Sequence, residues 1–200
     1  MSSKKSALSI VGISGNVTRP SRTATLVDTI LSAIEDRTGA TAKKIELKDA
    51  APILFSTLTP ADISPQGREI IEAVESADLL VVATPVYRGS YTGALKHLFD
   101  LARREAFAGK PVILAATGGS PLHGLVIEHE LRPLFGFFNA LAVPTAIYAT
   151  EADFHDYRLA DPVTAERIDR AVNEAVRFLD PAVSIAFNAI GRASGAVATA

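Results

Sequence analysis

Hydroxyl and guanidinium side chains gather in one short segment near the start of the chain. Residues 14–23 read Ser-Gly-Asn-Val-Thr-Arg-Pro-Ser-Arg-Thr, directly after an apolar run and directly before a segment with helical spacing. Such groups, together with the unpaired N–H groups of a helix start, can bind a dianionic phosphate. For a single hydroxyl, such as that of Ser21 or Thr23, helix capping in a solvated turn is the alternative. The segment is neither a Walker loop nor a Gly-x-Gly-x-x-Gly dinucleotide site.

Two further segments could contact a flat ligand. Residues 85–93 read Pro-Val-Tyr-Arg-Gly-Ser-Tyr-Thr-Gly, and the two glycines let the backbone approach a planar ring closely. Tyr87 and Tyr91 could flank an aromatic ring, although tyrosines at strand ends are more often packing residues. Residues 117–123 read Thr-Gly-Gly-Ser-Pro-Leu-His, whose adjacent glycines indicate either contact with a ligand or a tight turn.

Metal and thiol chemistry is not indicated. The chain has no cysteine, which excludes disulfides, thiolate metal sites, iron–sulfur clusters and a cysteine nucleophile. His123 and His129 are six residues apart and lack a neighbouring set of ligands, so we expect no metal site.

The composition indicates one globular domain. Of 200 residues, 48% are hydrophobic and 21% are charged, values close to globular averages. Lys and Arg number 20 against 22 Asp and Glu, and this near-balance argues against a nucleic-acid partner. No stretch approaches the roughly 18 apolar residues of a membrane span, and the polar start lacks the apolar core of a secretion signal. We therefore expect a soluble cytoplasmic protein without a membrane partner.

Alternating apolar runs and helical patterns indicate the fold. Apolar runs of strand length lie at 8–13, 44–47, 79–84, 112–116 and 143–148. Helical spacing lies between and after them, at 22–37, 65–76, 92–104, 123–140 and 162–179. This alternation predicts an α/β fold, in which a parallel sheet has helices on both faces.

The strand patterns predict the strand order. The third run is continuously apolar, as in a central strand, while residues 43–47 alternate between polar and apolar, as at an edge. We predict a flavodoxin-like three-layer α/β/α sandwich with a five-stranded parallel sheet of order 2-1-3-4-5. In this fold ligands bind beyond the carboxyl ends of the strands, between strands one and three, where the three segments above would meet.

The chain is expected to form one domain with a short extension. The sequence Asp180-Pro181 is a stop signal for the last helix. We predict a domain over residues 1–180 and a C-terminal extension over 181–200. In the extension, a docked segment with Ile185, Phe187 and Ile190 would precede a mobile tail.

The three segments resemble those of the NAD(P)H-dependent FMN reductase family, which has the flavodoxin-like fold. The similarity is greatest to the reductases that supply reduced FMN to alkanesulfonate and methanesulfonate monooxygenases, and it extends over residues 8–179. The matching stretches are Ser14-Gly15, 20–23, 83–96, 116–120 and 128–135.

The resemblance implies roles for these residues. The first segment would hold the phosphate of FMN through Ser14, Ser21, Arg22 and Thr23. The other two would line the isoalloxazine ring through Pro85, Val86, Tyr87, Arg88, Gly89, Ser90, Thr117, Gly118, Gly119 and Ser120. The first segment is longer than in alkanesulfonate-type members, so residues 16–19 receive no role. Arg88 could orient the phosphates of a nicotinamide nucleotide or point into solvent, and no side chain is firmly assigned to catalysis.

The fourth helical segment carries a second feature. Pro133 cannot donate to the carbonyl of His129, so the helix must bend or widen there. The resemblance implies a π-type turn at a tetramer contact, with His129 where relatives commonly have Tyr. The alternative is a bent helix with a satisfied polar side chain. Residues 131–138 are apolar on more faces than one helix can bury, so we expect a homo-oligomer, which is a tetramer by resemblance.

The implied activity is flavin reduction. NADH or NADPH would transfer a hydride to FMN, and FMNH2 would pass to a partner monooxygenase of sulfonate-sulfur metabolism. Two alternatives are open: a quinone, azo or chromate reductase that retains FMN, and a flavodoxin-like electron carrier that does not oxidise NAD(P)H. Carriers are usually strongly acidic monomers, which the net charge of −2 does not favour. The sequence shows no clear clamp for a ribose 2′-phosphate, so it does not distinguish NADH from NADPH.

Overall fold

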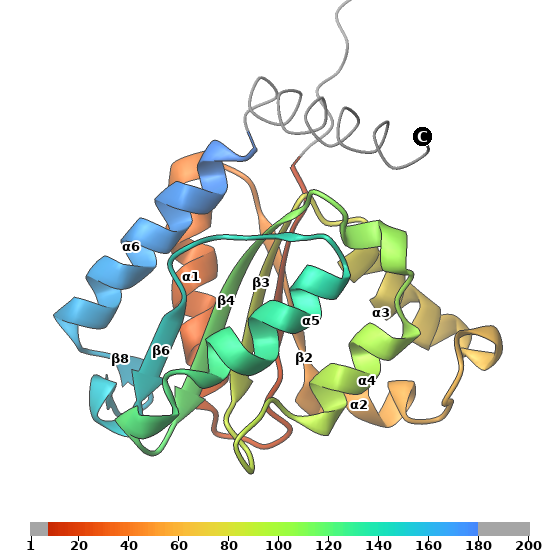
Figure 1. Ribbon diagram of the computed structural model, residues 1–200, viewed down its shortest axis with the longest axis horizontal. Helices are drawn as coiled ribbons and strands as arrows, with labels where there is room; N and C mark the ends of the chain where they lie inside the picture. Colours follow the sequence, from red (N-terminus) through yellow and green to blue (C-terminus); the bar gives the residue numbers. More distant parts are fainter. Residues whose placement is uncertain (1–7, 180–200) are drawn as a thin grey trace, which may run out of the picture.

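The computed structural model describes residues 8–179 of the chain. Over these residues a parallel sheet lies between two layers of helices (Figure 1). The predicted C-terminal extension at 181–200, with Ile185, Phe187 and Ile190, lies outside the described residues.

The sheet has the predicted strand order. Its strands are β1 (Ile10–Ser14), β2 (Ala42–Glu46), β3 (Leu79–Pro85), β4 (Pro111–Gly118), β5 (Leu141–Ala142) and β6 (Ile147–Thr150). The order is β2-β1-β3-β4-β5, with β6 also beside β4, and every pair is parallel. β3 is buried over its whole length, whereas β2 lies at the edge and buries only Ile45. The predicted flavodoxin-like α/β/α sandwich is confirmed.

The fifth strand differs from the prediction. Instead of one strand over 143–148, the chain forms the two short strands β5 and β6. Pro144 has no N–H to donate, and Thr145 donates its N–H and its hydroxyl to the carboxylate of Glu174 at 2.8 and 2.6 Å. Pairing with β4 resumes at Ile147. The prediction of a single strand was wrong because a side chain of the last helix takes these hydrogen bonds.

Helices cover both faces of the sheet. On one face lie α1 (Arg22–Thr38) and α6 (Pro162–Arg177). On the other lie α2 (Leu47–Leu54), α3 (Pro65–Glu75), α4 (Gly93–Leu101) and α5 (Arg132–Phe137). Helices α1, α3, α4 and α6 begin at side-chain caps, which are Ser21, Ser64, Thr92 and Asp161. The short α2 was not predicted, because it follows β2 directly and Glu46 makes no capping hydrogen bond.

The predicted fourth helix is not one continuous α-helix. A 3-10 turn at Pro121–His123 and a π-helical segment, η4 (Ile127–Leu131), precede α5. The N–H of Arg132 bonds to the carbonyl of Ile127, directly before Pro133. The widening expected at His129 is therefore confirmed, whereas the continuous helix over 123–140 was wrong.

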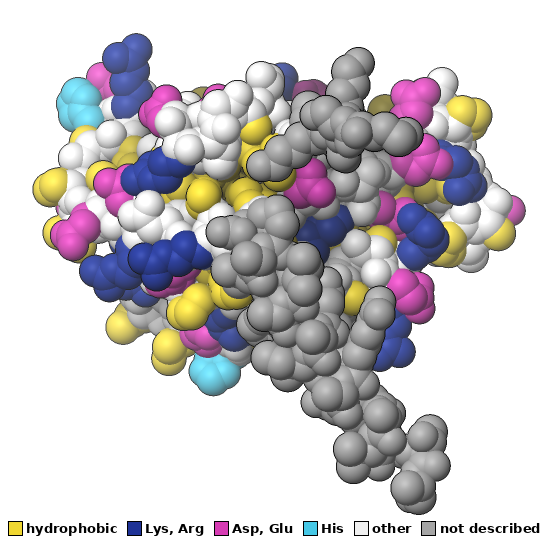
Figure 2. Space-filling view, turned by 90° about the horizontal axis from the view of Figure 1, so that it is seen from above, with side chains coloured by type: hydrophobic (Ala, Val, Ile, Leu, Met, Phe, Trp, Pro, Cys, Tyr) yellow, Lys and Arg dark blue, Asp and Glu magenta, His cyan; other side chains and the backbone are white. Residues whose placement is uncertain are grey.

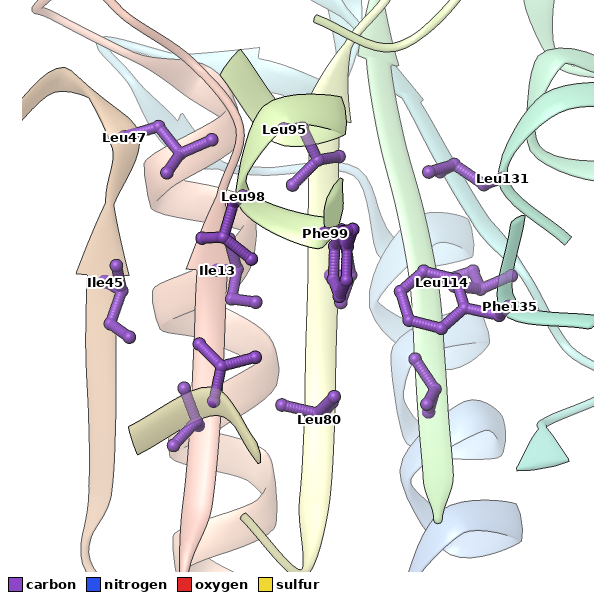
Figure 3. Close-up of a cluster of buried hydrophobic side chains, with 14 of the residues drawn as sticks. Ile13, Ile45, Leu47, Leu80, Leu95, Leu98, Phe99, Leu114, Leu131 and Phe135 are labelled. Carbon is purple, nitrogen blue, oxygen red and sulfur yellow. The ribbon is translucent and has the colours of Figure 1, made fainter. Parts of the chain in front are cut away.

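The larger core lies between the sheet and the layer of helices that contains α4 and α5. Figure 3 shows its members from strands and helices, among them Ile13, Leu80, Leu114, Leu95, Leu98, Phe99, Leu131 and Phe135. Phe99 and Phe135 pack edge to face, with 5.0 Å between ring centroids. Phe135 and Phe138 are buried and Phe137 is 57% exposed, so one of the three rings in this run remains outside the core.

Gly12 determines how closely α1 packs on β1. A Cβ atom at this position would lie 2.7 Å from both Val27 Cγ1 and Leu31 Cδ1, so a larger residue would push the helix away. This close packing of α1 on β1 limits how far the loop between them, residues 15–21, can move away from the sheet.

A short antiparallel hairpin connects β6 to α6. It consists of β7 (Phe154–His155) and β8 (Arg158–Leu159). Lys and Arg side chains are interspersed with Asp and Glu on the face shown in Figure 2. Within residues 8–179, no helix has the length and apolar character needed to cross a bilayer.

Candidate functional site

The carboxyl ends of the strands meet at the lower edge of Figure 1, where a cleft of about 240 Å³ opens. It lies among the loops that follow β1, β3, β4 and β6, at the point where the strand order reverses between β1 and β3. The residues that line it are Asn16, Thr18, Pro20, Ser21, Arg22, Thr23, Pro85, Val86, Tyr87, Thr117, Gly118, Gly119, Thr150, Glu151 and Tyr157.

The lining contains most of the residues singled out from the sequence. Those that line the cleft are Ser21, Arg22, Thr23, Pro85, Val86, Tyr87, Thr117, Gly118 and Gly119. Those outside the lining are Ser14, Arg88, Gly89, Ser90 and Ser120. The lining residues to which the sequence assigned no role are Asn16, Thr18, Pro20, Thr150, Glu151 and Tyr157.

The start of α1 presents several hydrogen-bond donors to the cleft. Ser21 Oγ accepts from the N–H of Ala24 at 3.1 Å, and the first helical hydrogen bond runs from Thr25 N to Ser21 O. The N–H groups of Arg22 and Thr23 precede that bond, so they have no acceptor within the helix. With the Arg22 guanidinium, they are groups that could bind an anion at the positive end of the helix.

Two side-chain hydrogen bonds join the walls of the cleft. The hydroxyls of Thr23 and Thr117 lie 2.6 Å apart, and both residues are buried, which ties the first loop to the third. Tyr87 donates its hydroxyl to Asn16 Oδ1 at 3.1 Å, which ties the second loop to the first. The three loops are therefore fixed relative to one another.

Backbone contacts hold the first two loops together. Gly15 donates its N–H to Ala83 O at 2.7 Å, and the Thr92 hydroxyl donates to Gly15 O at 2.8 Å. Thr84 Oγ1 in turn accepts from the N–H of Thr92 at 3.2 Å. A Cβ atom at residue 15 would lie 3.0 Å from Ala83 O, so this approach of the two backbones depends on glycine.

The tip of the second loop projects beside the cleft. Tyr87 and Ser90 exchange two backbone hydrogen bonds, of 2.9 and 3.2 Å, around Arg88 and Gly89. Both central residues have positive φ, 54° and 81°, as in a tight hairpin turn. The two residues are exposed, and the Ser90 hydroxyl donates to Glu130 Oε2 at 2.9 Å. This geometry explains why the tip lies outside the lining.

Ser14 and Ser120 do not line the cleft. Ser14 is 1% exposed, and within residues 8–179 its Oγ is the buried side-chain oxygen that lacks a hydrogen-bond partner. Ser120 caps the turn Pro121–His123 by accepting from the N–H of Leu122 at 3.2 Å. Its carbonyl accepts from the Tyr148 hydroxyl at 2.6 Å, and burial raises the pKa of that hydroxyl, which favours its protonated, donating form.

A segment after β6 forms a further wall of the cleft. Arg22 donates a hydrogen bond to Glu151, and its guanidinium lies 5.0 Å from the ring centroid of Tyr157. Both partners follow Thr150, the last residue of β6, so the parallel sheet brings them to the edge where the other loops lie. Their place after the last predicted strand was the sequence signal that could have identified them.

The cleft suits a planar ligand that bears a phosphate, such as FMN. The donors at the start of α1 match the chemistry of a dianionic phosphate. Pro85, Val86 and Tyr87 form a wall beside them, while Gly118 and Gly119 present backbone rather than bulky side chains.

A doubly wound sheet of this order, whose loop after β1 lines a cleft at the switch point, is that of a flavodoxin-like protein. The family model described as NADPH-dependent FMN reductase matches residues 8–155, and the chain belongs to this family. It is therefore an oxidoreductase that uses FMN and a reduced nicotinamide nucleotide.

Named relatives and a solved structure agree with this assignment. The chain is 46% identical over 168 residues to the NADH-dependent FMN reductase SfnF of Pseudomonas fluorescens, over 84% of this chain and 90% of that protein. It is 44% identical over 170 residues to the FMN reductase (NADPH) of Pseudomonas aeruginosa, over 85% and 91%. The apo form of an NADH:FMN oxidoreductase (EMOB) aligns with a TM-score of 0.77 and 30% identity, over 88% of this chain and 94% of that one.

The substitution Gly118→Ala tests the packing behind the third loop. A Cβ atom at residue 118 would lie 2.1 Å from Tyr148 Oη and 3.1 Å from its Cζ, so the ring and the loop that it holds must shift. We expect the dissociation constant for FMN to rise about tenfold, because overpacking of this kind costs on the order of 1–3 kcal/mol. A titration that follows flavin fluorescence measures the change.

Two controls accompany this variant. Gly136→Ala adds the same methyl group in α5, where a Cβ atom would have no neighbour within 4 Å beyond its own helix backbone. Tyr148→Phe removes the atom nearest to the new methyl group, so the double variant Gly118→Ala/Tyr148→Phe should recover part of the affinity. An unchanged dissociation constant in Gly118→Ala alone would remove the third loop from the flavin site.

Proposed function

We propose that this chain is a cytoplasmic NAD(P)H:FMN oxidoreductase that takes FMN as an exchangeable substrate. We further propose that it supplies FMNH2 to a partner monooxygenase of sulfonate-sulfur metabolism. The observation that carries the proposal is the cleft at the β1–β3 switch point, which combines phosphate donors with a small volume of about 240 Å³. The similarity to proteins named FMN reductases supports the reaction, and the resemblance to the sulfonate-pathway reductases supports the choice of partner.

The phosphate of FMN is assigned to the start of α1. Ser21 offers a hydroxyl, Arg22 a guanidinium and an N–H, and Thr23 a further N–H. The buried Ser14 supports this loop from behind, and Ser120 supports the third loop through its cap. The isoalloxazine ring is assigned to the space beside residues 85–87 and 117–119.

The cleft is small for the ligand that we assign to it. Pockets that bury most of a drug-sized ligand measure about 300–1,000 Å³, whereas this cleft measures about 240 Å³. One face of the ring would thus stay accessible to the nicotinamide nucleotide. FMN supplies the hydride acceptor when bound, so the residues of the cleft need only position the two substrates. The exposed turn of Arg88, Gly89 and Ser90 is assigned to the approach of the nucleotide.

The face around η4 is assigned to a homotetramer contact. Leu122, Leu125 and Phe137 on this part of the chain are 88%, 64% and 57% exposed. His129 is also exposed and lies one turn from Leu125, since its N–H bonds to Leu125 O at 3.0 Å. These side chains are spread along the segment from Pro121 to Phe137, and exposed apolar side chains of this kind can form an interaction surface. We therefore assign His129 to assembly rather than to hydride transfer.

The substitution Leu125→Asp tests this contact. A carboxylate on an apolar interface must lose its hydration without a partner, so assembly should be disrupted. Size-exclusion chromatography with light scattering should give the mass of four chains for the wild type and of one or two for the variant. Leu58→Asp is the matched control, because Leu58 is 82% exposed in the loop between α2 and α3. A monomeric wild type, or a tetrameric Leu125→Asp, would contradict the assignment.

The substitution Ser21→Asp tests the phosphate site. Aspartate caps helices as well as serine does, so α1 keeps its cap while the new carboxylate faces the phosphate. We expect the dissociation constant for FMN to rise at least about tenfold by like-charge repulsion. Riboflavin, which has no phosphate, should bind with little change, and flavin fluorescence measures both affinities.

Ser64→Asp provides the matched control for this experiment. Ser64 caps α3 by accepting from the N–H of Gly67, so the substitution changes the same type of cap and the same charge elsewhere. If neither affinity changes in Ser21→Asp, or if both fall together, the first loop does not hold the phosphate.

Steady-state oxidation of NADH and NADPH tests the function as a whole. The acceptors are FMN, FAD, riboflavin and a quinone, and FMN should be used most efficiently because the cleft offers donors to its phosphate. Flavin that stays bound through gel filtration, with ping-pong kinetics on the quinone, would point instead to a reductase that retains FMN. If added FMN does not stimulate nucleotide oxidation, the electron-carrier alternative is favoured.

A further inference from the structure

A carboxylate lies in the cleft against the main positive charge of the phosphate loop. Glu151 lines the cleft, and the Nη2 group of Arg22 donates a hydrogen bond to its Oε1. Tyr157 lies on another side of the same guanidinium, with its ring centroid 5.0 Å from Arg22 Cζ. Arg22 is therefore already engaged by two side chains at the place assigned to the phosphate of FMN.

The backbone fixes the position of Glu151. The turn Glu151–Asp153 has a reciprocal cap, in which Asp153 Oδ2 accepts from the N–H of Thr150 at 2.5 Å. The carbonyl of Asp153 accepts from the N–H of Ala160 at 2.8 Å, which closes the base of the β7–β8 hairpin. The backbone of Glu151 is thus part of a turn whose hydrogen bonds fix its position.

The same hairpin places Tyr157 against Arg22 at a conformational cost. Asp156 and Tyr157 both have positive φ, 48° and 59°, at the tip of the hairpin. A bulky aromatic residue rarely adopts this conformation. The two positive φ values are those of a two-residue hairpin turn, and this turn places the Tyr157 ring on the Arg22 guanidinium.

The charges at the start of α1 favour an anion there. The first turn of α1 contains no acidic residue, and Arg22 adds a positive charge at the end of the helix that is already positive. Glu151, which is 129 residues away in the sequence, supplies the balancing charge. Because the side chains of Arg22 and Glu151 are 34% and 67% exposed, water screens the pair and an incoming phosphate can replace it.

We propose that Glu151 is an internal competitor for the phosphate of FMN. It occupies Arg22 when no phosphate is bound, so an incoming phosphate must displace its carboxylate from the guanidinium. The consequence is a lowered affinity for FMN, which lets the flavin exchange as a substrate instead of remaining as a prosthetic group. This inference rests on the proposed function, since it concerns the same phosphate site.

The substitution Glu151→Gln tests the inference by flavin binding rather than by activity. Glutamine keeps the size of the side chain and removes its charge. We expect the dissociation constant for FMN to fall about three- to tenfold, and the dissociation rate of FMN to fall with it. The dissociation constant for riboflavin should stay within about twofold, because riboflavin has no phosphate to compete for Arg22.

Arg22→Gln completes a double-mutant cycle. This variant should bind FMN more weakly, and the gain from Glu151→Gln should shrink to less than about twofold in its background. The gain in the wild-type background should also diminish at 0.5 M NaCl, because salt screens exposed charges on the scale of about 4 Å. Glu72→Gln, on the exposed side of α3, removes an equal charge away from the cleft and should leave both affinities unchanged.

The outcomes separate this inference from the proposed function. An unchanged FMN affinity in Glu151→Gln would overturn the inference, as would equal changes for FMN and riboflavin, which would mean that Glu151 contacts the flavin itself. An equal gain with and without Arg22 would also overturn it. If wild-type protein shows no saturable FMN binding at all, the proposed function fails, and the inference fails with it.

Discussion

The parallel pairing of β1 with β3 is the constraint on which the site depends. Its register places Ser14, the last residue of β1, opposite Ala83, so Gly15 can donate to Ala83 O at 2.7 Å while β3 continues to Pro85. The chain leaves β1 toward α1 on one face of the sheet and leaves β3 toward α4 on the other. The two loops therefore diverge, and a crevice opens between them. Strand order creates the cleft, and the loop residues decide only what it can bind.

Local patterns in the sequence were sufficient for most of the fold, whereas distant contacts were not. The starts of α3 and α6 each combine a capping side chain with a proline in the next position, as in Ser64-Pro65, and both starts were predicted. Pro133 likewise indicated the widened turn in η4 from its chemistry alone. The break in the fifth strand depends on Thr145 binding Glu174, 29 residues away, and no local pattern contains that pairing.

In the candidate site, too, local patterns were predictable from the sequence and contacts between distant residues were not. The composition of residues 14–23 predicted that this loop faces a ligand, and Ser21, Arg22 and Thr23 do line the cleft. The tip of the second loop, Arg88 to Ser90, lies outside the cleft lining because Arg88 has a positive φ. Few arginines adopt this conformation, and the sequence did not indicate it. Glu151 and Tyr157 were missed because only the loops after strands one, three and four were assigned to the site, although the predicted parallel sheet also brings the end of its fifth strand to the same edge.

One hydrogen bond connects the cleft to the face assigned to assembly. The Ser90 hydroxyl closes the second loop onto Glu130 Oε2 at 2.9 Å, and Glu130 belongs to η4, beside His129. The widened turn exists because Pro133 cannot continue the α-helical hydrogen bonds. A second chain packed on η4 would restrict the same turn that flanks the mouth of the cleft. Under the proposed assembly, contacts on η4 would therefore reach the second loop through Ser90, while the Thr23–Thr117 hydrogen bond holds the first and third loops together independently of that face.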